Sequence, residues 1–182
     1  MITVAVRTCL PGAVLACLLL APAAAGAADP LQPWTGGPTP ALKGKTLDGD
    51  AFALADYRGR VVLVNFWATW CAPCVAEMPA LQRLRERLAP RRAEVVAVNF
   101  QENAARIAPF VERLRLTFPV VRDHDGTLRT AWSVTVFPTT FVVGPDGRIA
   151  WVAVGEVDWD DPRVESRIRR LGQGTGQLAR AP

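Results

Sequence analysis

The sequence predicts an α/β domain in which a mixed central β-sheet is flanked by helices. Two observations lead to this fold class. Between residues 61 and 116, runs of β-forming residues alternate with segments of helical periodicity, which predicts parallel strands joined by right-handed crossovers. Two more β-forming runs follow within residues 139–154 with a tight turn between them, which predicts an antiparallel pair in the same sheet. The chain has 182 residues, half of them hydrophobic, which suffices for one domain with its own core.

The elements before the central strand are short. Residues 28–38 are rich in proline and glycine and are interpreted as a linker. Residues 42–52 have the pattern of a β-hairpin that turns at Asp48 and Gly49, which would be an N-terminal extension of the fold. After a short connector, residues 61–67 form a run of almost entirely apolar, β-forming residues. Such a run is typical of a strand that is buried on both faces.

The remaining elements are predicted from periodicity and from turn residues. In chain order they are helix 74–88, strand 94–100, helix 103–116, extended segment 118–121, helical turn 128–132, strands 139–143 and 149–154, and helix 161–171. Pro79 lies inside the first helix and is expected to kink it. Asn103 is a suitable N-cap for the second helix. Residues 172–182 have little to pack and are expected to form a flexible tail.

The first 27 residues have the pattern of a signal peptide. Arg7 supplies a positive charge, the stretch 8–28 is uncharged with a leucine-rich centre, and residues 25–27 form an A-x-A-type cleavage site. The alternative is an uncleaved membrane anchor, because the uncharged stretch is just long enough to span a bilayer. We therefore expect an exported, periplasmic protein that is membrane-anchored if the leader is not cleaved.

The charge of the chain argues against nucleic acid as a partner. The formal net charge is +4, from 21 basic and 17 acidic residues. Basic and acidic residues alternate along most of the chain, so no basic stripe of the kind that tracks a phosphate backbone is formed.

The cysteines point to redox chemistry. Cys9 and Cys17 lie in the leader, so the exported chain keeps only Cys71 and Cys74, separated by two residues, in an oxidising compartment. This pair falls where the first strand meets the first helix, and a helix N-terminus favours thiolate over thiol. We expect Cys71 to be the exposed nucleophile and Cys74 the buried resolving thiol. Pro73 suits the first helical position, where its missing N–H is not needed.

Other uses of the pair fit the sequence less well. A zinc site needs two further N or S ligands, and His124 is the only histidine, so no metal is expected. A disulfide that closes so short a loop gains little as a purely structural link. A copper or haem chaperone, a binding module rather than an enzyme, would need a Met or His near the motif. No cofactor is expected either.

Residues 65–79, NFWATWCAPCVAEMP, resemble the active-site segment of the TlpA/ResA branch of the thioredoxin superfamily. The resemblance extends over about residues 39–171, the predicted thioredoxin-like domain. It implies a thioredoxin fold with an N-terminal hairpin. It also implies a thiol-disulfide oxidoreductase that reduces disulfides of other exported proteins, often in cytochrome c maturation. Electrons would come from a membrane donor of the DsbD or CcdA type.

The same resemblance assigns the principal site residues. Cys71 matches the nucleophile of the family and Cys74 its resolving cysteine. Glu77 matches a helix carboxylate near the pair, and Pro138 matches a cis-proline that precedes the next strand. Because thioredoxins carry a titratable Asp where this chain has Asn65, Glu77 is the nearest replacement for proton transfer.

Three more residues are predicted to bind substrate. Trp70 and Pro73 border the nucleophile in sequence, and Phe137 precedes the proline of the cis-proline match. Many family members have a small residue in place of Phe137, and the branch dedicated to haem ligation has an acid in place of Thr139. These two departures favour a general reductase. A disulfide oxidase or isomerase of the same fold remains the alternative enzyme.

Overall fold

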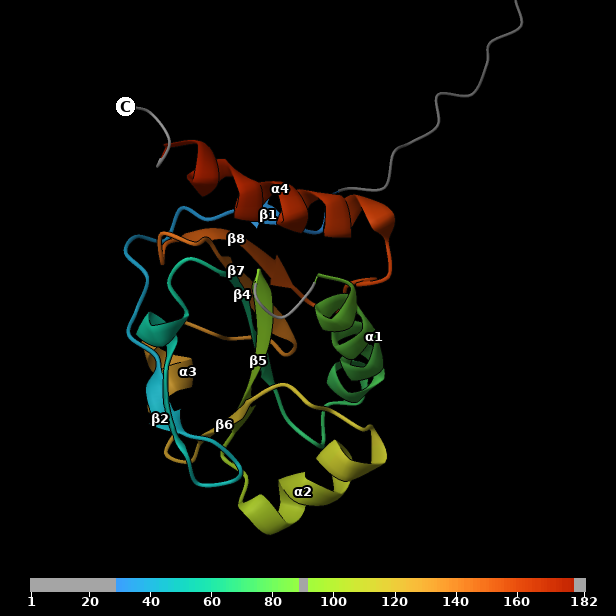
Figure 1. The fold of residues 1–182 in the computed structure, drawn as a ribbon. Coiled ribbons are helices and arrows are strands. Elements are labelled where there is room, and N and C mark those ends of the chain that lie inside the picture. The colour runs from blue at the N-terminus through green and yellow to red at the C-terminus, as the bar shows by residue number, and fades with distance from the viewer. Residues whose placement is uncertain (1–28, 89–91, 179–182) are drawn as a thin grey trace, which may run out of the picture.

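A mixed six-stranded sheet forms the centre of the computed structural model, which describes residues 29–88 and 92–178 (Figure 1). In spatial order its strands are β1 (Gln32–Pro33), β8 (Ile149–Val154), β7 (Thr139–Val143), β4 (Val61–Trp67), β5 (Ala93–Phe100) and β6 (Val120–Asp123). Strands β4, β5 and β6 are parallel to one another, whereas β7, β8 and β1 add by antiparallel pairing. A separate antiparallel pair consists of β2 (Lys43–Lys45) and β3 (Ala51–Ala53).

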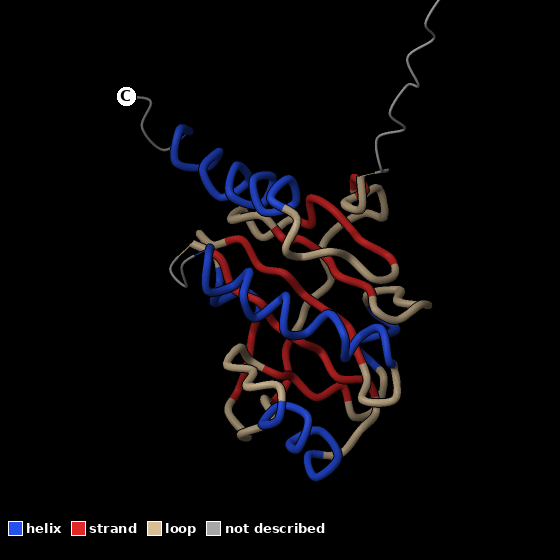
Figure 2. The backbone as a smooth tube through the Cα atoms, turned by 90° about the vertical axis from the view of Figure 1, so that its right-hand side faces the viewer, coloured by secondary structure: helices blue, strands red, loops and turns tan. Residues whose placement is uncertain are grey.

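Helices and the hairpin cover the two faces of this sheet. The elements are α1 (Ala72–Leu88), α2 (Ala104–Arg113), α3 (Thr127–Ala131), α4 (Pro162–Leu178) and a 3-10 helix at Leu54–Tyr57. Helices α1 and α4 pack on one face, while α3 and the β2–β3 hairpin pack on the other (Figures 1 and 2). Each face has its own hydrophobic core. This is the mixed, helix-flanked sheet with an N-terminal hairpin that the sequence predicts, and it has the arrangement of the thioredoxin fold.

The central strand β4 serves both cores. Leu63 and Trp67 face the core under α1, and Val64 and Phe66 face the core under α3. All residues of the strand are buried. A strand with partners on both faces has no solvent side, so the alternation of polar and apolar residues disappears. The apolar run at residues 61–67 therefore predicts this element correctly.

Some element boundaries differ from the prediction. Helix α1 begins at Ala72 rather than at residue 74, and β6 lies two residues later than the extended segment 118–121. Asn103 caps α2 as expected, with its side-chain oxygen accepting from the backbone N–H of Arg106 at 2.9 Å. This helix ends at Arg113 rather than at residue 116. Arg115 has a φ of 52°, and a left-handed residue cannot continue a right-handed helix.

The predicted linker and tail take part in the fold, which corrects both expectations. Leu31 is only 1% exposed, and β1, inside the range 28–38, pairs with β8. At the other end, α4 runs on to Leu178 instead of ending at residue 171. Residues 172–182 were expected to have little to pack, but Gly172 lies so close to Val61 that a Cβ would sit 3.4 Å from its side chain.

The start of the described chain is fixed to the last helix. Asp29 forms an ion pair with Arg167 of α4, and Arg167 also donates to the carbonyl of Leu31 at 3.2 Å. The predicted signal peptide, residues 1–27, lies outside the described residues. Among residues 29–88 and 92–178, no helix combines the length and apolarity needed to cross a membrane.

Candidate active site

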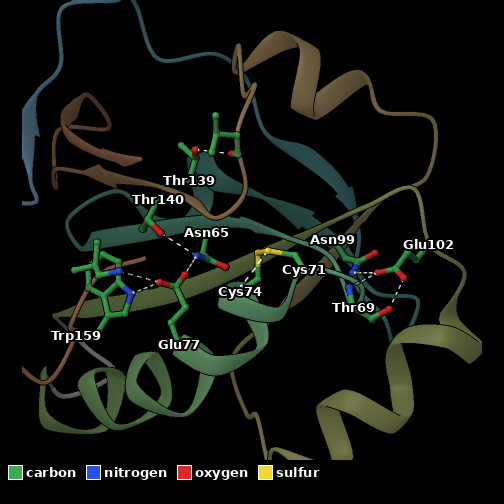
Figure 3. Close-up of a disulfide and its surroundings, with 12 residues drawn as sticks. Asn65, Thr69, Cys71, Cys74, Glu77, Asn99, Glu102, Thr139, Thr140 and Trp159 are labelled. Carbon is green, nitrogen blue, oxygen red and sulfur yellow. Dashed lines mark hydrogen bonds between the residues drawn. A yellow bond between two sulfur atoms is a disulfide. The ribbon is translucent and has the colours of Figure 1, made fainter. Parts of the chain in front are cut away.

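The two cysteines form a disulfide at the N-terminus of α1 (Figure 3). Cys71 immediately precedes the helix, and Cys74 lies in its first turn. Cys74 is completely buried. Cys71 is the more accessible of the two but is only 7% exposed, so the expectation of an exposed nucleophile needs correction. Cys71 belongs to the core under α1, against which Phe137 also packs.

The local backbone favours negative charge on Cys71. The backbone N–H of Cys74 donates to Cys71 Sγ at 3.3 Å, and the first turn of α1 carries no acidic residue. Pro73 is the second residue of the helix rather than the first, but it still lies in the turn where N–H groups have no partner inside the helix. The sulfur therefore faces the positive end of the helix dipole without a competing carboxylate in that turn. This arrangement favours the thiolate form of Cys71.

An aromatic rim borders the disulfide, and we define it as Trp70, Phe137 and Phe100. Trp70 is 60% exposed and packs edge-on against Phe137, with ring centroids 5.7 Å apart. Phe137 in turn contacts Phe100, with centroids at 5.4 Å. The Phe137–Pro138 peptide bond is cis, as the family resemblance implies. Sequence reasoning missed Phe100, because it reaches the rim from the end of β5 and no local pattern signals that contact.

Glu77 is buried behind the disulfide and accepts three hydrogen bonds. Asn65 Nδ2 donates to Oε1 at 2.7 Å, and the indole N–H of Trp159 donates to Oε2 at 3.0 Å. The backbone N–H of Val157 adds a longer bond of 3.4 Å to Oε2. Burial raises the pKa of Glu77 to about 7, although the three donors oppose that rise. The carboxyl group can therefore gain and lose a proton near neutral pH.

The Glu77 environment includes a residue that the sequence analysis did not single out. Trp159 lies 82 positions after Glu77, in the connection between β8 and α4, and is fully buried. Nothing near it in the sequence resembles a motif. Only the packing of α4 beside α1 brings its indole to the carboxylate. Asn65 belongs to the quoted motif, and the structure shows that it also donates to Thr140 Oγ1 at 2.9 Å.

A second buried carboxylate, Glu102, lies on the Cys71 side of the disulfide (Figure 3). It accepts from the backbone N–H of Thr69 at 2.7 Å and from Asn99 Nδ2 at 2.8 Å, and it also accepts from the Thr69 hydroxyl. Arg106 of α2 pairs with it at 3.6 Å. These contacts tie the loop before Cys71 to α2. Glu102 was also missed, because it stands alone between a strand and an N-cap.

The described part of the chain offers no metal centre. In residues 29–88 and 92–178, His, Cys, Asp and Glu side chains do not gather in groups of three or more that could hold an ion. His124 lies in an exposed turn. The site itself brings together two sulfur atoms, a buried carboxyl group and a helix N-terminus.

Comparisons with known proteins agree with this geometry. Thiol-disulfide oxidoreductase ResA of Geobacillus thermodenitrificans is 37% identical over 115 residues, which are 63% of this chain and 66% of that protein. Thioredoxin-like protein YneN of Bacillus subtilis is 40% identical over 114 residues, 61% of this chain and again 66% of the relative. The chain thus spans slightly less than two thirds of the length of these relatives. The resemblance to the TlpA/ResA branch is confirmed.

Solved structures share the fold. A thiol:disulfide interchange protein of the thioredoxin family from Chlorobium tepidum matches with a TM-score of 0.66 and 28% identity, over 79% of this chain and 98% of that one. A secreted thiol-disulfide isomerase from Corynebacterium glutamicum matches with a TM-score of 0.70 and 25% identity, over 81% and 95%. The family model described as AhpC/TSA matches residues 35–152. That range includes both cysteines and more than half of the sequence, and the chain therefore belongs to the AhpC/TSA family.

Proposed function

We propose that this protein is an exported thiol-disulfide oxidoreductase that reduces disulfides of other exported proteins. The observation that carries the proposal is the Cys71–Cys74 pair at the N-terminus of α1, with the more accessible sulfur next to the exposed Trp70. The relatives named as thiol-disulfide oxidoreductases support it. Export rests on the signal-peptide pattern of residues 1–27 and on similarity to a protein described as secreted.

The proposed reaction is a dithiol exchange. The thiolate of Cys71 attacks one sulfur of the substrate disulfide, so that a mixed disulfide forms, the substrate S–S bond breaks and the departing sulfur takes up a proton. Cys74 then loses its proton and attacks the sulfur of Cys71. The Cys71–Cys74 bond forms, the mixed disulfide breaks and the substrate leaves as a dithiol. Two electrons have passed from the cysteine pair to the substrate.

Glu77 accepts the proton of Cys74 in this scheme. It follows Cys74 by three residues, so both side chains lie on one face of α1. A general base works best when its pKa is near the ambient pH, and burial raises the pKa of Glu77 to about 7. The carboxyl group is held in position by its three donors.

The reductase proposal also requires a binding place for the substrate protein and a source of electrons. The aromatic rim, together with Pro73 and Pro138, would hold an extended segment of the substrate beside the disulfide. Such a reductase in an oxidising compartment needs a supply of electrons, for which we propose a membrane dithiol donor of the DsbD or CcdA type. Cytochrome c maturation is one process that uses this chemistry. Thr139 and Phe137 favour a broader substrate range.

A redox titration of the protein against glutathione tests the direction of the reaction. We expect a reduction potential nearer that of thioredoxin, about −270 mV, than that of the oxidant DsbA, about −120 mV. The reason is that Ala72 and Pro73, the two residues between the cysteines, add no cationic group that would stabilise the thiolate further. A potential above about −160 mV would instead favour the oxidase alternative.

A further inference from the structure

The amide oxygen of Asn65 is a buried acceptor without a hydrogen-bond donor. The Asn65 side chain is completely buried, and its Oδ1 has no partner among the described residues. The amide nitrogen, by contrast, uses both of its hydrogens, one on Glu77 and one on Thr140. Most buried polar atoms in proteins are paired, so an unpaired one calls for an explanation.

The orientation of this amide is fixed by its neighbours. Asn65 Nδ2 lies 2.7 Å from Glu77 Oε1 and 2.9 Å from Thr140 Oγ1. When Glu77 is ionised, exchanging the oxygen and nitrogen positions would place Oδ1 against its carboxylate, two acceptors facing each other. Oδ1 must therefore point away from Glu77. In Figure 3, Asn65 lies between Glu77 and the disulfide, and its oxygen is on the side of the sulfur atoms.

The disulfide state offers this oxygen no hydrogen to accept, because neither sulfur carries one. Reduction by a dithiol donor breaks the S–S bond, and two electrons enter the pair while the donor becomes a disulfide. Cys71 keeps the backbone N–H of Cys74 and the helix N-terminus as partners for a thiolate. The fully buried Cys74 takes up a proton instead, and its S–H group is a weak donor.

We propose that Asn65 Oδ1 accepts a hydrogen bond from the thiol of Cys74 when the pair is reduced. This inference rests on the proposed roles of the two cysteines. A hydrogen bond from the neutral thiol stabilises the neutral form of Cys74. Asn65 thereby helps to leave the negative charge on Cys71. Because the same amide donates to Glu77, it also joins the resolving thiol to the carboxyl group in one hydrogen-bonded chain.

Infrared spectroscopy of the S–H stretching band tests the proposal directly. The full chain would carry Cys9→Ala, Cys17→Ala and Cys71→Ser, so that Cys74 provides the single thiol. We expect a band at the lower frequency of a hydrogen-bonded thiol. Asn65→Leu removes the acceptor and should move the band to the frequency of a free thiol. Asn65→Asp retains an oxygen and should keep it low.

Thr140→Val is the matched control. It removes a polar group that contacts the same amide at the same depth but leaves Oδ1 in place, so the band should stay where it is. A band that is already at the free-thiol frequency before Asn65 is changed overturns the proposal. So does a shift in Thr140→Val as large as that in Asn65→Leu.

A second measurement leaves Asn65 and both site cysteines unchanged. In the chain with Cys9→Ala and Cys17→Ala only, the side-chain carbonyl carbon of Asn65 should change its NMR chemical shift when the disulfide is reduced. An unchanged shift overturns the inference. An insulin-reduction assay on the same sample tests the proposed function separately, because a protein could form this hydrogen bond and still fail to reduce a substrate.

Discussion

Glu77 holds a buried carboxyl group beside a pair of thiols, and its charge must influence theirs. A negative charge near a thiol disfavours a second one, so ionised Glu77 should raise the pKa of the cysteines and titrate together with them. We expect Glu77→Gln to lower the apparent pKa of Cys71 and to slow release of substrate from the mixed disulfide. Thiolate absorbance against pH and single-turnover kinetics measure the two effects. Overlaid titration curves and release rates within about twofold of each other would exclude Glu77 as a proton acceptor.

The raised pKa of Glu77 also makes the stability of the fold depend on pH. Its pKa is about 7 in the folded protein, against 4.5 for an ordinary glutamate. The folded state therefore binds the proton more tightly. The contribution of Glu77 to stability is fully present below pH 4.5 and is lost as the pH rises through 7. The difference of about 2.5 pH units corresponds to at most about 3–4 kcal/mol.

Glu77→Gln should abolish this fall, which denaturant unfolding at several pH values would measure. Asp160 and Glu165 behave in the opposite way, because hydrogen bonds from Arg83 and Arg87 respectively lower their pKa values and their contribution is lost as the pH falls. The unchanged protein and Glu77→Gln share that contribution, so it cancels when the unfolding free energies of the two are subtracted at each pH. If the unfolding free energy changes equally with pH between 4.5 and 7 in the unchanged protein and in Glu77→Gln, the expectation is contradicted.

At the scale of elements, the connection between β8 and α4 controls the Glu77 site through Trp159. Arg87 of α1 donates to the carbonyl of Trp159 at 3.1 Å and pairs with Asp160 and Glu165, so the connection is held against α1. The indole then reaches Glu77 from a fixed position. A residue far away in the sequence thus lowers the pKa of a buried carboxyl group next to the cysteines, against the larger effect of burial.

Trp159→Phe removes one donor to the ionised carboxylate and should raise the pKa of Glu77 further. We expect a loss of about 1–3 kcal/mol in unfolding free energy at pH 8, where Glu77 is ionised, and a smaller loss at pH 5. Trp132→Phe is the matched control, since Trp132 is equally buried in the opposite core and donates to the carbonyl of Ala41. A loss independent of pH in both variants would mean that Trp159 acts only by packing.

Features that depend on neighbouring residues could be predicted from the sequence, whereas contacts between distant residues could not. Strands β4, β7 and β8 were predicted with the observed bounds, because their burial leaves a continuous signal in neighbouring residues. Cys71 and Cys74 were recognised because a redox pair of this kind is separated by only two residues in the sequence. The contacts of Glu102 with Thr69 and of Trp159 with Glu77 join residues 33 and 82 positions apart, and only tertiary packing creates them. Leu31 was missed because the glycines and prolines around it dominate the local composition.

For the whole molecule, the proposed reductase role requires a supply of electrons in an oxidising compartment. In cells with the membrane donor we expect a substantial fraction of the Cys71–Cys74 pair to be reduced, and deletion of the donor should make it fully oxidised. Acid quenching followed by thiol alkylation and mass analysis gives the two fractions. A pair that is fully oxidised in cells with every such donor would rule out the reductase direction.

The ion pair between Asp29 and Arg167 fixes where the chain enters the domain. Arg167 belongs to α4, and Gly172 of the same helix meets Val61 at the start of β4, whereas Cys71 follows the opposite end of that strand. Seven residues of strand separate the two ends by about 20 Å. A protein coupled to a bead or sensor surface through its N-terminal segment would therefore present its disulfide to the solution. Capture of substrates on such a surface would need no spacer.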